Sequence, residues 1–305
     1  MEKQKFIDYI LKNLNADTVS DPKLQNALNE LLEKSHEDIL ASANSSVVDF
    51  LVKNLNSETV EQTEIQQALR KLTWQQREAI ALKTKSRLYY YDEEVAAVRT
   101  AEELILEKVM PDNYCLNDLS VLNGLNIGAG GRTVSDYVIC LDFNKGAEET
   151  TGVNGIVKNS ILSNAANLPF KDESIDYIIA LHILEHCAEP VHVLNEWLRV
   201  LKPGGKLGVV IPNWKYNWNA ASDTSKYGHR WNTSPESASD MIDKHFKEKL
   251  LHFNTYPYKL SFDFVLKKPG VFKPFQPSFE PTGFDLAQGI EKDYYVYNSE
   301  VITTK

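Results

Sequence analysis

A glycine-rich turn directly after an apolar run is the feature that most constrains the fold of this chain. The run from Leu122 to Gly131 reads LNGLNIGAGG, with Gly128 and Gly130 where the strand-like part ends. Glycine has no side chain, so the backbone can turn sharply there and come close to a bulky ligand. Ligands of open α/β sheets bind at the carboxyl ends of the strands. The turn therefore predicts an α/β sheet with a ligand at that edge.

Strand-like and helical runs alternate after Pro111. The strand-like runs are LSVLNGLNIG, DYVICLDF, NGIVKNSIL, DYIIALHI and KLGVVIP, and VHVLNEWLRVL has the spacing of an amphipathic helix. This alternation predicts a mostly parallel sheet with helical crossovers. Two more strand-like runs flank Pro257, so we expect an antiparallel pair at an edge of the sheet. The proline-rich segment and the tail after these runs are expected to lie on the surface.

The residues around the turn favour a nucleoside as the ligand. Asp142 ends the next strand-like run, and its carboxylate can accept two hydrogen bonds from a ribose diol. A dinucleotide-binding turn would need a further glycine and then a helix whose N-terminus holds a pyrophosphate. Position 133 is Thr, and the interval between Gly131 and the next strand-like run is too short for a helix.

Segments further along the chain carry a resemblance to a known family. NIGAG, CLDF, NAANLPF, SIDYIIALHILEH and RVLKPGG occur in this order between about residues 115 and 215. In this order they closely resemble the class I S-adenosylmethionine-dependent methyltransferases. The resemblance implies a Rossmann-like sheet, mostly parallel with an antiparallel edge strand, S-adenosylmethionine as methyl donor and S-adenosylhomocysteine as product. The short interval before Asp142 looks most like compact members linked to glycan or nucleotide-sugar modification, so a sugar hydroxyl is the expected acceptor.

The resemblance also assigns positions to the cofactor. The glycine turn would lie under its methionine part, Asp142 would hold the ribose hydroxyls, and Asn164 would contact the adenine amino group. The complete set implied for the cofactor is Asn126, Gly128, Ala129, Gly130, Asp142, Phe143, Asn164, Ala165 and Leu181. Two positions depart from the family pattern: Asn126 replaces a common acidic residue, and Arg132 replaces a third glycine. An arginine there would crowd the cofactor carboxylate or pair with it.

The run HILEH at positions 182–186 has two interpretations. Two histidines four residues apart with a glutamate between them fit the HxxEH pattern of a class of zinc peptidases. Similar runs are common in methyltransferases directly after the fourth strand, so we expect no metal. His182 is then a candidate catalytic base, because a neutral imidazole near the transferred methyl group could accept a hydroxyl proton. A polar pocket residue without a catalytic role is the alternative.

The segment from Asn213 to Trp231 follows the fifth strand, where this fold builds its acceptor pocket. Aromatic plates beside hydrogen-bonding groups suit a sugar ring, and an arginine suits a phosphate. The predicted substrate residues are Trp214, Tyr216, Trp218, Arg230 and Trp231, and His229 is the second candidate base. The alternative is a surface loop with packed aromatic residues. RVLKPGG, despite its distinctive composition, is expected to be structural and to end a helix at Gly204.

The amino-terminal part contains an internal repeat. Residues 6–31 align without gaps onto residues 47–72 with 11 identical pairs, and each copy has the apolar spacing of a helical hairpin. The copies carry no His or Cys cluster, so they are expected to be architectural, or to mediate homodimer formation or docking of a partner enzyme through residues 1–72. The expected domains are a helical repeat domain at 1–73, connecting helices at 74–112 and a methyltransferase domain at 113–305.

Composition excludes several other classes of protein. Asp and Glu outnumber Lys and Arg by 42 to 33 without a basic run, which disfavours a nucleic-acid partner. Three cysteines without a CxxC pair, and no long apolar run, predict a cytoplasmic protein without a membrane span. Three rival functions stay open: a catalytically weak methyltransferase-like scaffold, an HxxEH metallopeptidase, and methylation of a small isoprenoid or amine.

Overall fold

The computed structural model describes residues 55–61, 65–66, 69–70, 72–142, 160–217, 219–222, 228–273 and 295–296. Contacts divide the chain into two compact units, Met1–Val95 and Ala96–Lys305. The first copy of the predicted repeat lies outside the described residues, as does part of the second copy, so the repeat domain stays a prediction. Phe143 and Trp218 also lie outside the described residues.

The segment from 74 to 112, where the sequence predicted connecting helices, contains three helices. These are α8 (Trp74–Thr84), α9 (Asp92–Glu103) and α10 (Ile105–Lys108), and α6 (Ser57–Val60) precedes them. A capping box between Thr73 and Gln76 begins α8, and Lys85 ends it with a left-handed backbone at φ 56°. No Pro or Gly marks this end, because a lysine takes the position that glycine usually occupies.

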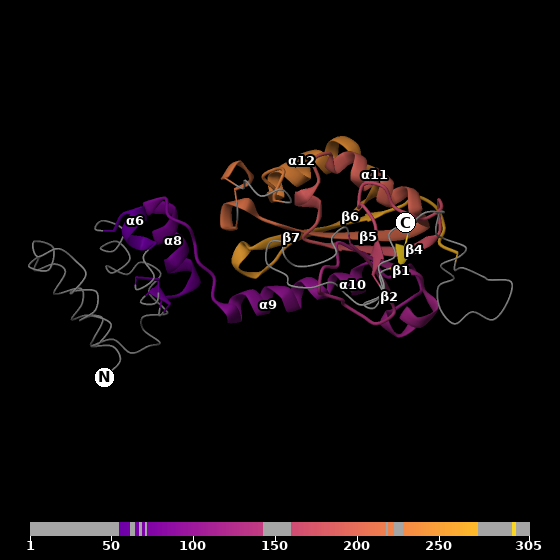
Figure 1. The fold of residues 1–305 in the computed structure, drawn as a ribbon, viewed down its shortest axis with the longest axis horizontal. Coiled ribbons are helices and arrows are strands. Elements are labelled where there is room, and N and C mark those ends of the chain that lie inside the picture. The colour runs from indigo at the N-terminus through magenta and orange to yellow at the C-terminus, as the bar shows by residue number, and fades with distance from the viewer. Residues whose placement is uncertain are drawn as a thin grey trace, which may run out of the picture. The chain divides into compact units, whose positions relative to one another are not determined.

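The second unit contains one sheet (Figure 1), and its strands occur in the order β6-β7-β5-β4-β1-β2-β3-β8. The strands are β1 (Gly124–Ile127), β2 (Val138–Asp142), β3 (Ile161–Leu162), β4 (Ile175–Leu181), β5 (Leu201–Pro212), β6 (Leu250–Thr255), β7 (Ser261–Lys267) and β8 (Tyr295–Val296). The five strands from β3 to β5 pair in parallel. β7 runs antiparallel to both β5 and β6, and β8 runs antiparallel to β3. The predicted Rossmann-like sheet is therefore confirmed.

The predicted strand pair around Pro257 is also confirmed, but two elements were not predicted. Pro257 lies in the turn between β6 and β7. Helix α12 (Pro235–His245) begins with a capping box between Ser234 and Ser237, and its first half is rich in serine. β8 lies in the tail that the sequence assigned to the surface. The remaining short helices are η1 (Leu116–Val121), η3 (Leu184–His186), η4 (Trp214–Tyr216), η5 (Ala220–Ser222), η6 (Lys247–Lys249) and η7 (Pro257–Lys259).

Helix α11 (Pro190–Val200) ends earlier than the sequence predicted. Its last residue is Val200, and Gly204 lies within β5 with φ +74°. The backbone of Phe272 would lie 2.3 Å from a Cβ at Gly204, so a side chain does not fit there. The glycine thus serves a close approach of two chain segments, and it does not end the helix.

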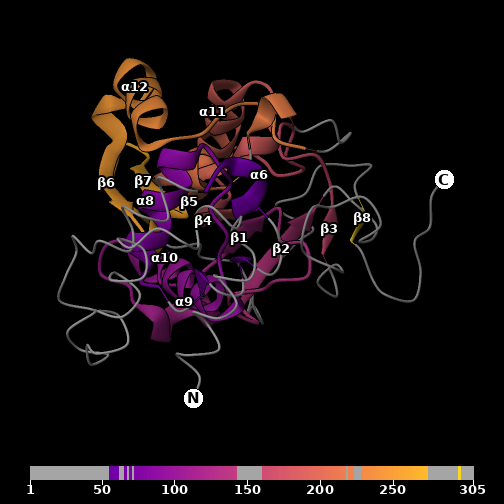
Figure 2. The same cartoon turned by 90° about the vertical axis from the view of Figure 1, so that its left-hand side faces the viewer.

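Buried side chains on both faces explain the strongly apolar central strands. Ile178 and Ala180 of β4 belong to one core cluster, whereas Tyr177, Ile179 and Leu181 belong to the other. This alternation is the two-residue period of a strand that is covered on both sides. Helices α11 and α12 lie on one side of the sheet and α10 lies on the other (Figure 2). No helix in the described part of the chain has both the length and the apolar character that a membrane crossing requires.

Helix α11 also holds the loop that follows β3. Trp197 Nε1 donates to the carbonyl of Ala165 at 2.8 Å, and Glu196 accepts from the backbone N–H of Leu168 at 2.8 Å. The guanidinium of Arg199 donates to the carbonyls of Leu168 at 3.2 Å and Phe170 at 2.9 Å. The segment NAANLPF is thereby fixed to the core by Arg199, a role that the sequence did not predict for the first residue of RVLKPGG.

Replacement of Arg199 by Lys should lower the stability of the fold. A lysine keeps the charge but cannot donate in a fork to two backbone carbonyls and two carboxylates. We expect the free energy of unfolding, measured by chemical denaturation, to fall by about 1–3 kcal/mol. The reverse exchange at exposed Lys171, Lys171→Arg, is the control and should change it by less than about 0.5 kcal/mol. An Arg199→Lys variant as stable as the parent chain would contradict this role.

Candidate active site

The glycine turn after β1 is closed against the segment that follows β4. The backbone N–H groups of Gly128 and Ala129 both donate to the carbonyl of Leu141, at 2.8 and 3.1 Å. Gly128 has φ +69°, and a Cβ at this position would lie 2.7 Å from the side chain of Ile183. Only glycine combines this backbone conformation with this close approach. The turn therefore forms a cradle of backbone atoms at the carboxyl edge of the sheet.

Asp142 ends β2 beside this cradle. Its Oδ2 accepts a hydrogen bond from the backbone N–H of Gly130 at 2.7 Å, and its carbonyl accepts from the N–H of Ser163 at 2.9 Å. The carboxylate of Asp142 is thus bound to the glycine turn, and the backbone of Asp142 is bound to the loop after β3. Asn164 follows in that loop, where its Oδ1 accepts from the N–H of Ala166 at 2.9 Å.

Asn126 and Arg132 bind the glycine turn to β1 and α9. Asn126 is buried in β1, and its Nδ2 donates to the carbonyl of Arg132 at 3.2 Å. Its Oδ1 is buried and has no hydrogen-bond partner among the described residues. The guanidinium of Arg132 binds α9 through the carbonyl of Arg99 at 2.7 Å and through Glu102 and Glu103. It is therefore held by α9, an arrangement that the sequence did not predict.

The structure brings the described members of the predicted cofactor set to one edge of the sheet. The cradle, Asp142 and the loop with Asn164 come from the ends of three adjacent strands, β1, β2 and β3. Leu181 ends the neighbouring strand β4. This edge fits a nucleoside with a short chain: a carboxylate for the ribose, a glycine cradle that a Cβ would fill, and an unsatisfied amide oxygen at Asn126.

His182, the first candidate base, binds a carboxylate from a distant helix. It follows β4 with φ 55°, and its Nε2 lies 2.8 Å from Oε1 of Glu102 in α9. Its Nδ1 lies 3.6 Å from Oε1 of Glu185. Both ring nitrogens therefore face carboxylates. Ser261 Oγ also donates to Glu102 Oε1 at 2.6 Å.

The charges of this pair stabilise each other. Burial by itself lowers the pKa of an imidazolium, but the charge of Glu102 and its hydrogen bond outweigh burial and raise the pKa of His182 to about 10. Burial opposes ionisation of Glu102 as well, but His182, Ser261 and Arg132 together lower the pKa of this carboxyl to about 2. The imidazolium form of His182 is favoured near neutral pH, and not the neutral imidazole that a catalytic base at this position would require.

Glu102 was not found from the sequence. It is 1% exposed, yet it stands in the helical run DEEVAAVRTAEE among acidic residues that look like a solvated face. Glu102 and His182 are 80 residues apart in the sequence. No local pattern distinguishes Glu102 from its neighbour Glu103, so only the tertiary structure shows it as part of the site.

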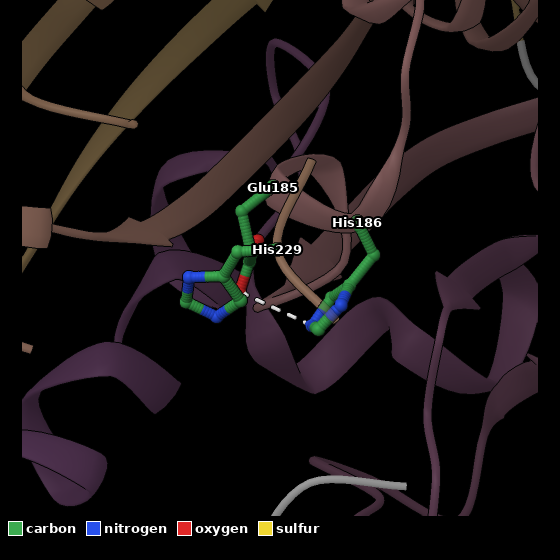
Figure 3. A group of neighbouring side chains, drawn as sticks. All are labelled: Glu185, His186 and His229. Carbon is green, nitrogen blue, oxygen red and sulfur yellow. Dashed lines mark ion pairs between the residues drawn. The ribbon is translucent and has the colours of Figure 1, made fainter. Parts of the chain in front are cut away.

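Glu185, His186 and His229 form a second cluster (Figure 3). The first two residues follow His182 in the sequence, and His229 comes from a later segment. Arg230 N donates to the carbonyl of Glu185 at 2.8 Å, and this backbone contact places His229 against η3. The rings of His186 and His229 meet edge to face at 5.0 Å. Burial opposes ionisation of Glu185, but the neighbouring histidines lower the pKa of its carboxyl below the ordinary value.

The HxxEH interpretation does not fit this geometry. That motif requires both histidines on one face of an α-helix. Here His182 has a left-handed backbone and binds Glu102, and the 3-10 helix η3 begins only at Leu184. The histidine that lies beside Glu185 and His186 is therefore not His182 but His229, which is 43 residues after His186 in the sequence.

The predicted substrate residues have unequal surroundings. Trp231 donates from Nε1 to the carbonyl of Leu184 at 3.0 Å and packs against the core, so it holds the segment of His229 in place. Trp214 and Tyr216 are half-buried in η4, and Arg230 is exposed. Lys259 Nζ lies 5.4 Å from the ring centre of Tyr216. Trp231 thus follows the packing alternative, whereas Trp214, Tyr216 and Arg230 remain accessible.

Comparisons with known proteins point to one class of domain. Residues 118–209 match a family described as a methyltransferase domain. A demethylmenaquinone methyltransferase of Listeria monocytogenes is 35% identical over 114 residues, which are 34% of this chain and 46% of that protein. An uncharacterized protein of Methanocaldococcus jannaschii is 41% identical over 118 residues, 37% of this chain and 51% of that protein. The chain spans about half the length of these curated relatives.

One solved structure with a similar fold is also described as a methyltransferase. It is an S-adenosylmethionine-dependent methyltransferase of Thermotoga maritima, described as a possible histamine N-methyltransferase, with a TM-score of 0.40 and 21% identity over 57% of this chain and 90% of that chain. By the family match, residues 118–209 form a methyltransferase domain. This domain implies S-adenosylmethionine as the cofactor, and the residues at the sheet edge fit it.

Loss of the Asp142 carboxylate should weaken cofactor binding. Asp142→Ala removes an acceptor from the ribose position and the hydrogen bond to Gly130, so we expect at least roughly tenfold weaker binding of S-adenosylmethionine and S-adenosylhomocysteine in calorimetric titrations. Asp240→Ala, at an exposed position of α12, is the matched control. Unchanged affinity in Asp142→Ala would place the cofactor elsewhere.

Proposed function

We propose that this chain is a methyltransferase that transfers the methyl group of S-adenosylmethionine to a hydroxyl oxygen of a small acceptor. One observation carries the proposal: two groups of residues lie at the same edge of the sheet. The first is the glycine cradle with Asp142, and the second is the ionisable cluster of Glu185, His186 and His229. The first suits the donor, and the second provides groups that can act on an acceptor proton. Both follow strands that are adjacent in the sheet.

The residues of the chain have three tasks in this reaction. When bound, S-adenosylmethionine supplies a methyl group on a positively charged sulfur; the S–C bond breaks as the O–C bond forms, and the electron pair stays on sulfur. Asp142 and the cradle orient the donor. The acceptor O–H bond must also break, and its proton needs a base within hydrogen-bond reach.

The two candidate bases differ in their geometry. Both ring nitrogens of His182 face carboxylates, at 2.8 Å from Glu102 and 3.6 Å from Glu185. We therefore assign His182 to positioning: it ties the end of β4 to α9. The proton of the acceptor is assigned to the cluster of Glu185, His186 and His229, with His229 as the residue that the sequence already singled out.

Two classes of acceptor are proposed, each with its own support. A sugar or nucleotide-sugar hydroxyl is supported by half-buried Trp214 and Tyr216 and by exposed Arg230, which could hold a phosphate. A quinone-like isoprenoid is supported by the name of the curated relatives, demethylmenaquinone methyltransferase, although that name does not specify a hydroxyl oxygen as the acceptor. The comparisons do not support a glycan acceptor in particular. An amine acceptor has no support of its own at this edge.

Location and partners are proposals as well. The three cysteines are free, with Cys115 exposed and Cys140 buried, which suits a reducing compartment such as the cytoplasm. Homodimer formation or partner docking through residues 1–72 is supported by the repeat in the sequence alone. A scaffold without catalysis is the weaker candidate, because the cradle and the ionisable cluster are both intact.

An acceptor panel tests the proposed function. The purified chain is incubated with labelled S-adenosylmethionine and nucleotide-sugars, glycans, hydroxylated quinones, isoprenoids or amines, and transfer of the label is measured. We expect transfer to at least one hydroxyl-bearing acceptor. His229→Ala should lower kcat by about 10²-fold or more and change cofactor affinity little, while His192→Ala, at an exposed position of α11, should change neither. Cofactor binding without transfer across the panel would favour the scaffold.

A further inference from the structure

We infer that Glu185, His186 and His229 form a binding site for a divalent transition-metal ion. Each residue offers one ligand atom, and these atoms all lie within 4.8 Å of one another (Figure 3). Two imidazole nitrogens and one carboxylate oxygen are a donor set that suits Zn²⁺, Mn²⁺, Fe²⁺ and Co²⁺. The sequence alone led to the opposite expectation, because His229 is remote from the HILEH run.

The distances are close to those of a metal site. Zn–N and Zn–O bonds of about 2.0–2.2 Å in a tetrahedron place ligand atoms about 3.4 Å apart. The cluster would reach that spacing with side-chain movements of roughly an ångström. Three protein ligands leave at least one coordination position for another molecule, the arrangement that is typical of catalytic metal sites.

A buried carboxylate oxygen is the second observation that points to a cation. Glu185 is 1% exposed, and its Oε2 has no hydrogen-bond partner among the described residues. Its Oε1 lies 3.8 Å from Nε2 of His186 and 3.6 Å from Nδ1 of His182, both longer than a hydrogen bond. A buried carboxylate with an unsatisfied oxygen is costly unless a cation or a donor completes it. A metal ion would supply that cation.

The surrounding contacts keep the three ligands together. Trp231 and Arg230 bind the carbonyls of Leu184 and Glu185, which holds the segment of His229 against η3. Thr233 is buried and donates to the carbonyl of Pro212 at 2.5 Å, which fixes the same segment to the end of β5. Ligands that are positioned by neighbouring hydrogen bonds bind metal more tightly than mobile ones.

The position of the site gives the metal a role, and this part of the inference rests on the proposed function. A hydroxyl group bound to a divalent cation releases its proton more readily than a free hydroxyl. The metal would hold the acceptor oxygen at the open position, and the hydroxyl proton would leave to solvent. His229 is then a metal ligand and not a free base. The loss of transfer expected for His229→Ala is the same in both cases, so metal binding has to be measured directly.

Metal binding is tested on the full chain without substrate or cofactor. The chelator-treated chain is titrated with Co²⁺, Mn²⁺ and Zn²⁺ by calorimetry, and its metal content is measured by mass spectrometry. We expect about one ion per chain, and at least roughly tenfold weaker binding in Glu185→Gln, His186→Gln and His229→Gln. Glu189→Gln and His192→Gln, at exposed neighbouring positions, are the matched controls and should bind as the parent chain does.

Spectra of the parent chain report the kind of ligand atom without any variant. Bound Co²⁺ should show d–d absorption without a thiolate charge-transfer band, and bound Cu²⁺ should show electron-spin coupling to nitrogen. No binding at micromolar metal would overturn the inference. So would affinity that survives all three substitutions, a thiolate band from nearby Cys187, or a Cu²⁺ spectrum without nitrogen coupling.

The role in transfer has a separate readout. If the inference holds, removal of the metal abolishes methyl transfer and its return restores it, with S-adenosylmethionine affinity unchanged within about threefold. Transfer that persists in the metal-free chain would overturn the metal's role and leave the proposed function standing. Metal binding with no transfer to any acceptor would overturn the proposed function and leave the metal site standing.

Discussion

The fully buried strand β4 positions everything at the carboxyl edge of this sheet. All seven of its residues, Ile175–Leu181, are buried, and β1 and β5 pair with it on either side. A strand that is covered on both faces cannot shift by one residue without moving its side chains into the wrong core. The chain therefore leaves β4 at a fixed point, and His182 turns it with a left-handed backbone. The glycine cradle, the pair of Glu102 and His182, and the cluster of Glu185, His186 and His229 all lie next to that point.

Buried charge is the second constraint on the site. Glu102 and Glu185 are each 1% exposed, and a buried carboxylate is stable only with a compensating charge or sufficient hydrogen bonds. Glu102 has His182, Arg132 and Ser261 around it, so its environment is complete within the described residues. Glu185 keeps one oxygen without a hydrogen bond. Glu102 therefore stabilises the site, whereas Glu185 has an oxygen available to bind a ligand.

The strands and the cofactor edge could be predicted because their signals are local. The apolar runs of β1, β2, β4 and β5, the glycine turn and Asp142 each depend on residues within one segment. Contacts between distant segments could not be predicted in the same way. Glu102 has the appearance of a solvated helix residue, and His229 reaches Glu185 only because Trp231 and Arg230 bind backbone carbonyls of the segment after β4. Helix α12 was missed because its first half, PESASD, consists mostly of residues that are common in turns and loops.

The central claim is that a methyl donor on the glycine cradle lies beside a metal held by Glu185, His186 and His229. A crystal structure of the full chain with S-adenosylhomocysteine and Mn²⁺, recorded with anomalous scattering, tests it most directly. The ribose hydroxyls should bind Asp142, and an anomalous peak bonded to all three ligands should lie at the sulfur end of the cofactor. A cofactor that leaves Asp142 untouched, or a peak elsewhere with none between these three residues, would contradict the account.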